Sequence, residues 1–193
     1  PLYLKESRRR FSFFNRILLK TEAIRAAFKE GTFVERFLTR VAKSLKENIR
    51  DEYERLQSVA DHSKKFVYVH LHYQPESTSS PLGDVFVDQI LMVKTLSAAL
   101  PEGWLIYVKE HPAQWFKRGF NFAGSRYRGY YEKISQIKNV RLVPVQTDGY
   151  ALIRSSQAVS TISGVTGSEA LLRRKPVLIF GYPWYQDCPG VFR

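Results

Sequence analysis

A charged triplet follows an apolar run in the middle of the chain, and it contains the clearest candidate for chemistry. Residues 104–108 read Trp-Leu-Ile-Tyr-Val and are followed by Lys109, Glu110, His111 and Pro112. Such a run is typical of a strand buried on both faces of a parallel sheet. Ligands of open α/β sheets bind at the carboxyl ends of the strands, and Pro112 restricts the backbone of His111. We therefore predict that His111 meets or protonates a phosphate, with Lys109 adding positive charge and Glu110 orienting the histidine.

A second group of candidates follows the first predicted strand. Gln74 and Glu76 lie in a hydroxyl-rich loop, residues 73–83, that suits phosphate or sugar binding. Glu76 could act as a base or a nucleophile at a sugar carbon, since both roles need a carboxylate on a fixed backbone. The competing interpretation is an ordinary turn in which Ser80 or Asp84 caps the next helix.

A glycine-rich turn is predicted between the fourth strand and the helix after it. Residues 163–170 read Ser-Gly-Val-Thr-Gly-Ser-Glu-Ala, and backbone N–H groups at a helix N-terminus favour anions. Glu169 could accept a ribose hydroxyl or simply cap the helix. The turn matches neither the dinucleotide fingerprint nor a Walker phosphate loop. Residues 181–185 then add an aromatic segment that could stack a base or a sugar, or merely cover the core.

Apolar runs alternate with helical periodicity from residue 61 onward, which predicts an α/β fold. The expected architecture is a Rossmann-like, doubly wound parallel sheet of five strands in the order 3-2-1-4-5. The predicted strands are 66–73, 104–108, 140–144, 158–163 and 176–181, and the predicted helices are 84–100, 127–137, 147–154 and 167–173.

Residues 1–60 are predicted to form a separate helical segment. Gly31 breaks the helical pattern, and Thr32 can cap a second helix with Glu35 at the capping-box position. The single apolar stripe of that helix needs a partner surface, such as a domain beyond this chain. A polar linker at residues 60–65 leads us to divide the chain into 1–60 and 61–193.

The balance of charge is strongly basic. The chain of 193 residues has a formal net charge of +12, which suits nucleic acids, anionic membranes or anionic small substrates. Arg8, Arg9 and Arg10 are the densest basic cluster and could bind phosphate or lipid, or form a solvated helix face. No zinc finger, RNA-recognition signature or basic zipper accompanies them, so specific nucleic-acid binding is not expected.

Cysteine content and hydropathy suggest a cytoplasmic protein, with peripheral contact to an anionic inner membrane as an option. Cys188 is the single cysteine, which excludes an internal disulfide and fits a reducing compartment. It lacks neighbours at metal-ligand spacing, and no apolar stretch approaches about 18 residues. The chain has no initiator Met and no closing helix, so we expect it to be a piece of a longer protein.

Taken together, five motifs resemble the capsule polysaccharide biosynthesis proteins. These are bacterial glycosyltransferases with two Rossmann-like domains (GT-B), several of which transfer 3-deoxy-manno-octulosonate (Kdo) from its CMP-activated form. The His-Pro pair is also similar to one that contacts the nucleotide phosphate in bacterial sialyltransferases. The resemblance extends over residues 66–187, and the motifs are residues 74–76, 109–112, 161–171, 175–177 and 180–181.

The resemblance implies that the chain is the donor half of such an enzyme, acting on a glycan or glycolipid acceptor. No residue cluster in the sequence requires a metal, so we expect no cofactor and expect cationic side chains and helix N-termini to neutralise the phosphate. Glu76 and His111 would be catalytic, with His111 on the donor phosphate, although some members carry an Asp where this chain has Thr78. Glu169 would hold the ribose. The implied nucleotide-sugar-binding residues are Gln74, Lys109, His111, Ser163, Gly164, Thr166, Gly167, Ser168 and Glu169.

Two other functions compete with this hypothesis. A CDP-polyol phosphotransferase of the teichoic-acid type also has a His-Pro pair and a serine-rich turn in its nucleotide half. A non-catalytic basic module for anionic glycan or nucleic acid would instead bind in a salt-sensitive way that ignores the identity of the nucleotide.

Overall fold

The computed structural model describes residues 21–22, 25, 28–35, 38, 49–74, 79–115 and 126–193. It divides into two compact units, Pro1–Glu47 and Asn48–Arg193. In the first unit, residues 28–29 and 33–35 are helical and are separated by a turn at Gly31, whose φ is +68°. The predicted break at Gly31 is therefore confirmed. The suggestion that this segment packs on a further domain stays a prediction.

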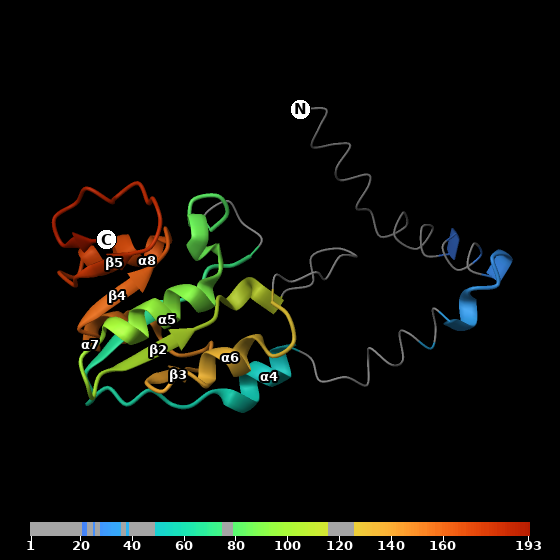
Figure 1. Cartoon of the computed structure of the whole chain (residues 1–193), viewed down its shortest axis with the longest axis horizontal. Helices are drawn as coiled ribbons and strands as arrows, with labels where there is room; N and C mark the ends of the chain where they lie inside the picture. Colours follow the sequence, from blue (N-terminus) through green and yellow to red (C-terminus); the bar gives the residue numbers. More distant parts are fainter. Residues whose placement is uncertain are drawn as a thin grey trace. The chain divides into compact units, whose positions relative to one another are not determined.

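The second unit is built on a parallel sheet, which confirms the predicted fold class. Its strand order is β3-β2-β1-β4-β5-β6, so the predicted order 3-2-1-4-5 is correct for the first five strands (Figure 1). Every neighbouring pair is parallel, and all carboxyl ends therefore lie along one edge. The strands are β1 (Phe66–His70), β2 (Leu105–Lys109), β3 (Val140–Leu142), β4 (Ala158–Thr161), β5 (Val177–Ile179) and β6 (Val191–Phe192).

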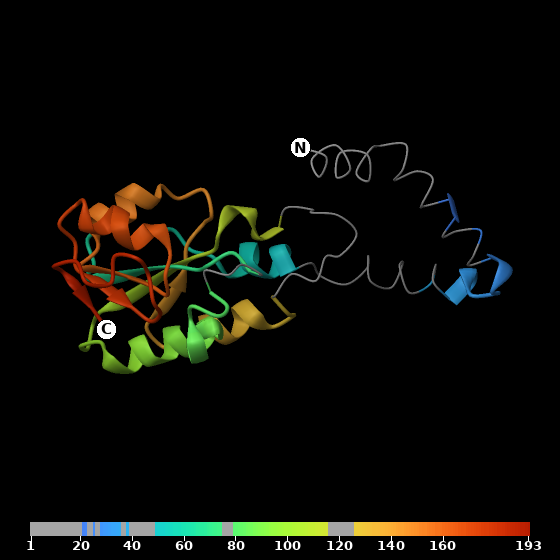
Figure 2. The same ribbon diagram turned by 90° about the horizontal axis from the view of Figure 1, so that it is seen from above.

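Helices cover both faces of this sheet, as Figure 2 shows. One face carries α5 (Gln89–Ala99) and α6 (Tyr130–Ser135). The other carries α7 (Gly149–Ser155) and α8 (Val165–Leu171). Strand side chains alternate between two buried clusters, with Val67, Val69, Ile106 and Val108 in one and Phe66, Tyr68, Tyr107 and Val159 in the other. The two-sided burial explains why the strands read as continuous apolar runs.

The helix α4 (Ile49–Leu56) belongs to the α/β unit, which therefore begins earlier than the boundary predicted at residues 60–61. Tyr53 is fully buried, and its hydroxyl accepts the Glu110 N–H (3.1 Å) and donates to the Val143 carbonyl (2.5 Å). Glu52 accepts N–H groups at the start of α6, including that of Tyr131 (2.8 Å). The buried Tyr53 thus fixes α4, a helix with few other apolar residues, to the sheet. The polar linker at 60–65 did not reveal this attachment.

Several element bounds differ from the predictions for local reasons. The predicted helix 84–100 is divided into the 3-10 helix η1 (Asp84–Val87) and α5, because Asp88 caps α5 by accepting the Ile90 N–H (3.0 Å). α8 begins at Val165 rather than Gly167, and α6 is shorter than predicted. The two-residue strand β6 has no apolar run and was not predicted. No helix among the described residues is long and apolar enough to span a bilayer.

Candidate functional site

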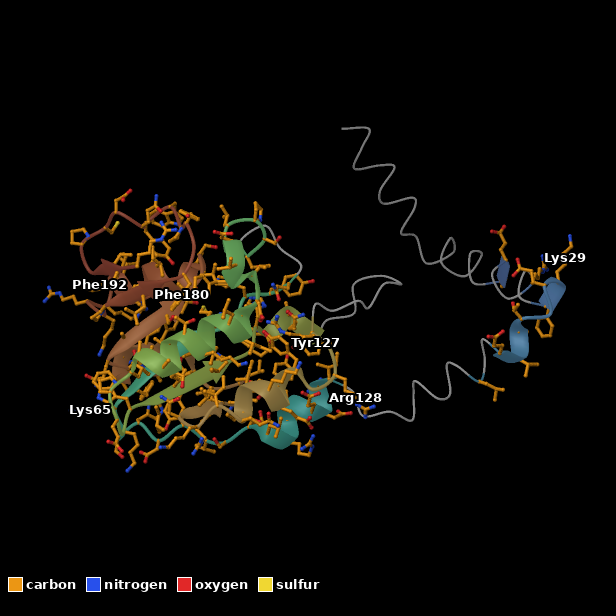
Figure 3. The ribbon with its side chains drawn as sticks, viewed as in Figure 1. Lys29, Lys65, Tyr127, Arg128, Phe180 and Phe192 are labelled. Carbon is orange, nitrogen blue, oxygen red and sulfur yellow. The ribbon has the colours of Figure 1, made fainter. Side chains whose placement is uncertain are left out.

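The parallel sheet gathers the predicted site residues at its carboxyl edge. His70 and Lys109 are register partners at the ends of β1 and β2, and His111 follows directly. In Figure 3, Lys65 before β1 lies at the opposite end of the sheet from Tyr127 and Arg128. The ends of β1, β2 and β4 therefore form the candidate site, at the edge where open α/β sheets bind ligands.

Lys109 lies on the α7 side of this edge. Its side chain is almost completely buried, and Nζ donates to the Thr147 carbonyl (2.6 Å) just before α7. Burial lowers the pKa of Lys109, and the carboxylate of Asp148 opposes that shift. Lys109 therefore supplies a positive charge held close to the protein backbone.

Glu110 is fully buried and is the centre of a closed polar network. Its carboxylate pairs with Arg126 (Nε to Oε2, 2.8 Å) and accepts the Tyr131 hydroxyl (2.6 Å). The other oxygen accepts the backbone N–H of His111 (2.7 Å). Burial opposes the charge of Arg126, but the Glu110 carboxylate, together with Tyr130 and Tyr131, produces a net rise in the pKa of Arg126. Glu110 thus fixes the backbone of His111 without facing a ligand.

Arg126 extends this network to the end of β1. Its guanidinium donates to the Gln74 side chain through Nη1 and to the His72 carbonyl through Nη2 (3.0 Å). The Gln74 amide nitrogen donates in turn to the Val87 carbonyl (3.1 Å). Both polar atoms of the Gln74 side chain are therefore engaged inside the protein, and its geometry is that of a scaffold residue at this edge rather than of a group facing a sugar.

His111 is half-buried and its ring orientation is defined. Its Nδ1 accepts the N–H of Ala113 (3.1 Å) in the 3-10 helix η2 (Pro112–Trp115), so the neutral ring carries its proton on Nε2. The rings of His70 and Tyr73 lie 5.6 Å and 5.7 Å from it, measured between centroids. His111 thus presents an N–H donor on a fixed backbone.

The glycine turn after β4 is held by His72. The Nε2 atom of His72 accepts the N–H groups of Ile162 (3.1 Å) and Ser163 (3.3 Å), and Thr161 Oγ1 accepts that of Gly164 (3.1 Å). Burial lowers the pKa of His72 to about 4, so the ring is neutral and suited to accept these bonds. These three N–H groups are therefore used inside the protein and are not the anion-binding donors expected of this turn.

The other predicted residues of the turn have different surroundings. Ser163 and Thr166 are each 9% exposed at the site edge. Gly167 packs so tightly against the Tyr185 ring that a Cβ there would overlap it, and Ser168 Oγ donates to the Val165 carbonyl (2.8 Å) within α8. Glu169 accepts the Tyr150 hydroxyl (3.3 Å) on the surface. Gly167 and Ser168 are thus used in packing, whereas Ser163, Thr166 and Glu169 remain candidates for ligand contact.

Glu76, one of the two predicted catalytic residues, is not among the described residues. Its neighbours Ser77 and Thr78 also lie outside them. Within the described part of the chain, no group of His, Cys, Asp and Glu side chains has the arrangement of a metal site.

Three residues at this edge were missed from the sequence: His70, His72 and Arg126. The two histidines occupy alternate positions at the end of an apolar strand, which is a signal that could have been used. Arg126 has no local signal, because its partners lie at the ends of two strands distant from it in sequence.

An apolar pocket of about 340 Å³ lies apart from these groups. It is bordered by η1, α5 and the β5–β6 end of the sheet, and Phe180 and Phe192 are among its lining residues (Figure 3). None of the predicted site residues lines this pocket. The candidate site is therefore assigned to the carboxyl edge of the sheet, where the titratable and polar side chains gather.

Comparison with known proteins adds a family and a fold. The sequence pattern of a family described as capsule polysaccharide biosynthesis protein matches residues 77–192. No curated protein sequence matches the chain. Among solved structures, the beta Kdo 2,7 transferase of Thermosulfurimonas dismutans KpsC is similar with a TM-score of 0.52 at 19% identity, over 72% of this chain and 40% of that one.

Two further solved structures are similar at lower TM-scores. The beta Kdo 2,4 transferase of the same KpsC gives 0.45 at 19% identity, over 73% of this chain and 48% of that one. The UDP-GlcNAc 2-epimerase from Methanocaldococcus jannaschii gives 0.47 at 14% identity, over 77% and 39%. The chain thus spans less than half the length of each of these three structures.

Proposed function

Because this chain belongs to the capsule polysaccharide biosynthesis protein family, we propose that it is the donor-binding part of a bacterial glycosyltransferase. The proposed donor is a CMP-linked, Kdo-like sugar, and the proposed acceptor is a growing glycan or glycolipid. The family membership and the Rossmann-like fold support the glycosyltransferase role. The resemblance of the sequence motifs to CMP-dependent members supports the choice of donor, as does the similarity in fold to the beta Kdo 2,7 transferase of KpsC.

The observation that carries this proposal is the fixed imidazole of His111. Its backbone N–H is bonded to Glu110 and its Nδ1 to the Ala113 N–H, so Nε2–H is oriented before any ligand arrives. A preorganised donor at a strand end can stabilise the charge that develops on a departing nucleotide phosphate. Lys109 adds positive charge from the neighbouring strand position. His111 would thus hold the phosphate and support its release.

The other predicted site residues would contact the nucleotide and the sugar. Ser163 and Thr166 would contact the nucleotide, and Glu169, next to Tyr150, would accept the ribose hydroxyls. Glu76 would supply the carboxylate at the sugar carbon, in keeping with the resemblance. The positive charge of the chain suits a negatively charged donor and a peripheral position at an anionic membrane surface.

Isothermal titration with CMP tests the proposal directly. Wild-type protein should bind CMP in preference to UMP, and His111→Ala should weaken CMP binding about tenfold or more, the usual loss when a hydrogen bond to a charged group is removed. His62→Ala is the matched control, because His62 lies at the amino edge of the sheet and bonds to Ser155. Equal affinity in wild type and His111→Ala would refute the role of His111.

Two further measurements separate the competing functions. Binding that ignores nucleotide identity and collapses with added salt would favour a general anionic-ligand module. For the complete enzyme, analysis of the products formed from CDP-glycerol and from CMP-Kdo would distinguish a polyol-phosphate transferase from a glycosyltransferase.

A further inference from the structure

We propose that His70 is a second imidazole that binds the donor phosphate, next to His111. This inference rests on the proposed function, and it adds to it a residue that neither the motifs nor the comparisons indicated. His70 is the last residue of β1, the strand that lies between β2 and β4. It is therefore placed between the Lys109–His111 segment and the glycine turn.

The first argument is that His70 has no hydrogen-bond partner in the described part of the chain. Its ring is half-buried and lies near the rings of Tyr68 (6.2 Å) and His111 (5.6 Å), in contacts that are edge-on and satisfy neither ring nitrogen. Most polar groups that are removed from water in proteins are hydrogen-bonded. The neighbouring His72, by contrast, uses Nε2 fully. A ligand atom would satisfy His70.

The second argument is the charge around His70. The titratable groups that act on it are His111, Lys109 and His72, all of which are cationic when protonated. Glu110, which follows Lys109 in the chain, is buried and already paired with Arg126. Burial, and to a lesser extent these three groups, together lower the pKa of His70 to about 3. A neutral ring among cationic groups is suited to donate to an anion rather than to bind a metal cation.

The third argument is the relation between the two rings. The planes of His70 and His111 are at 77°, and their centroids are 5.6 Å apart. Nitrogen–oxygen hydrogen bonds to charged oxygens are about 2.7–2.9 Å long, so donors from two such rings can reach different oxygens of one phosphate. His111 would hold one oxygen and His70 another. The pair would fix the orientation of the phosphate as well as its position.

The test compares CMP with cytidine, which lacks the phosphate. His70→Leu should weaken CMP binding about tenfold and leave cytidine binding unchanged, and His70→Asn should retain most of the affinity because it keeps a donor. His62→Leu is the control that removes a histidine at the amino edge. Equal CMP affinity in wild type and His70→Leu would refute the inference while the proposed function stands. If His70→Leu also lost cytidine binding, His70 would contact the base or the ribose, and the inference that it binds the phosphate would be refuted.

A second readout needs no substitution at all. The pKa of His70, followed by NMR of its ring, should rise when CMP saturates the wild-type protein, because a nearby anion favours the protonated ring. Cytidine should cause no such rise. An unchanged pKa with CMP bound would overturn the inference. Failure of wild type to bind any nucleotide would overturn the proposed function and this inference with it.

Discussion

Two loops at the carboxyl edge of the sheet are each fixed by a buried side chain, but in electrostatically different ways. The loop after β2 is held by the Glu110–Arg126 ion pair, and the turn after β4 is held by the neutral ring of His72. We call the Glu110–Arg126 pair the charged clamp and the His72 ring the neutral clamp. The charged clamp stabilises its loop only while both partners are present, because a lone buried charge is costly. The neutral clamp depends on one ring staying unprotonated. Between them lies His70, which neither clamp engages.

Breaking the charged clamp should have the largest effect. Arg126→Met leaves Glu110 buried without its partner, which should lower the free energy of unfolding by about 3–5 kcal/mol. Urea unfolding would measure this. Arg55→Met is the matched control, since its pair with Glu132 is exposed and should be worth no more than about 1 kcal/mol. Similar losses of stability in both variants would mean that the two ion pairs contribute equally, which would contradict the expectation that the buried pair contributes more.

Crowding the neutral clamp should have an intermediate effect. A Cβ at Gly164 would lie 2.8 Å from His72 Cε1 and 3.0 Å from Thr161 Oγ1, so Gly164→Ala should cost about 1–3 kcal/mol of stability and weaken CMP binding. Gly149→Ala, whose nearest neighbours are 3.7 Å away, should cause no loss. Thermal unfolding and CMP titration of both variants test this. A stable Gly164→Ala with normal binding would show that the turn is not held by His72.

Mild acidification, to pH 5.5, should destabilise the neutral clamp by a smaller amount. The pKa of His72 is lowered to about 4 in the folded protein from about 6.5 unfolded, so the unfolded state takes up the proton first. Its contribution to stability is complete above pH 6.5 and should fall by about 1.4 kcal/mol per pH unit between 6.5 and 4.

Urea unfolding at pH 7.5 and pH 5.5 measures this pH dependence. His72→Gln keeps an acceptor but cannot titrate in this range, so its stability should depend less on pH than that of wild type. His70 titrates in the same direction and remains in both proteins, so it does not account for the difference. Identical pH dependence in both proteins would exclude His72 as the titrating clamp.

The strand order could be predicted from sequence because each strand has a continuous apolar run and each crossover a helical pattern. Strands such as 66–70 and 105–109 are buried on both faces, so their composition reveals them. β6 could not be predicted, because its two residues pair with β5 through backbone contacts that composition does not encode. The edge that holds the site follows from the parallel topology alone.

The details of the site were less accessible from sequence, for a physical reason. Lys109 and His111 were found because they directly follow a strand. The contacts that decide what these residues can do are long-range: Arg126 reaches Glu110 and Gln74, and His72 reaches the turn after β4. Such contacts depend on tertiary packing, so a sequence pattern indicated the location of the site but not which of its polar groups were already occupied.

The attachment of α4 has a practical consequence for dissecting this protein. Tyr53 joins the end of β2 to the end of β3 through the Glu110 N–H and the Val143 carbonyl. A shortened chain starting at residue 61 would leave both of these buried groups unsatisfied, next to the residue that carries His111. A shortened chain should therefore start no later than Asn48, the first residue of the α/β unit. A chain cut at the apparent linker would lose α4, and with it the contacts that support nucleotide recognition at the end of β2.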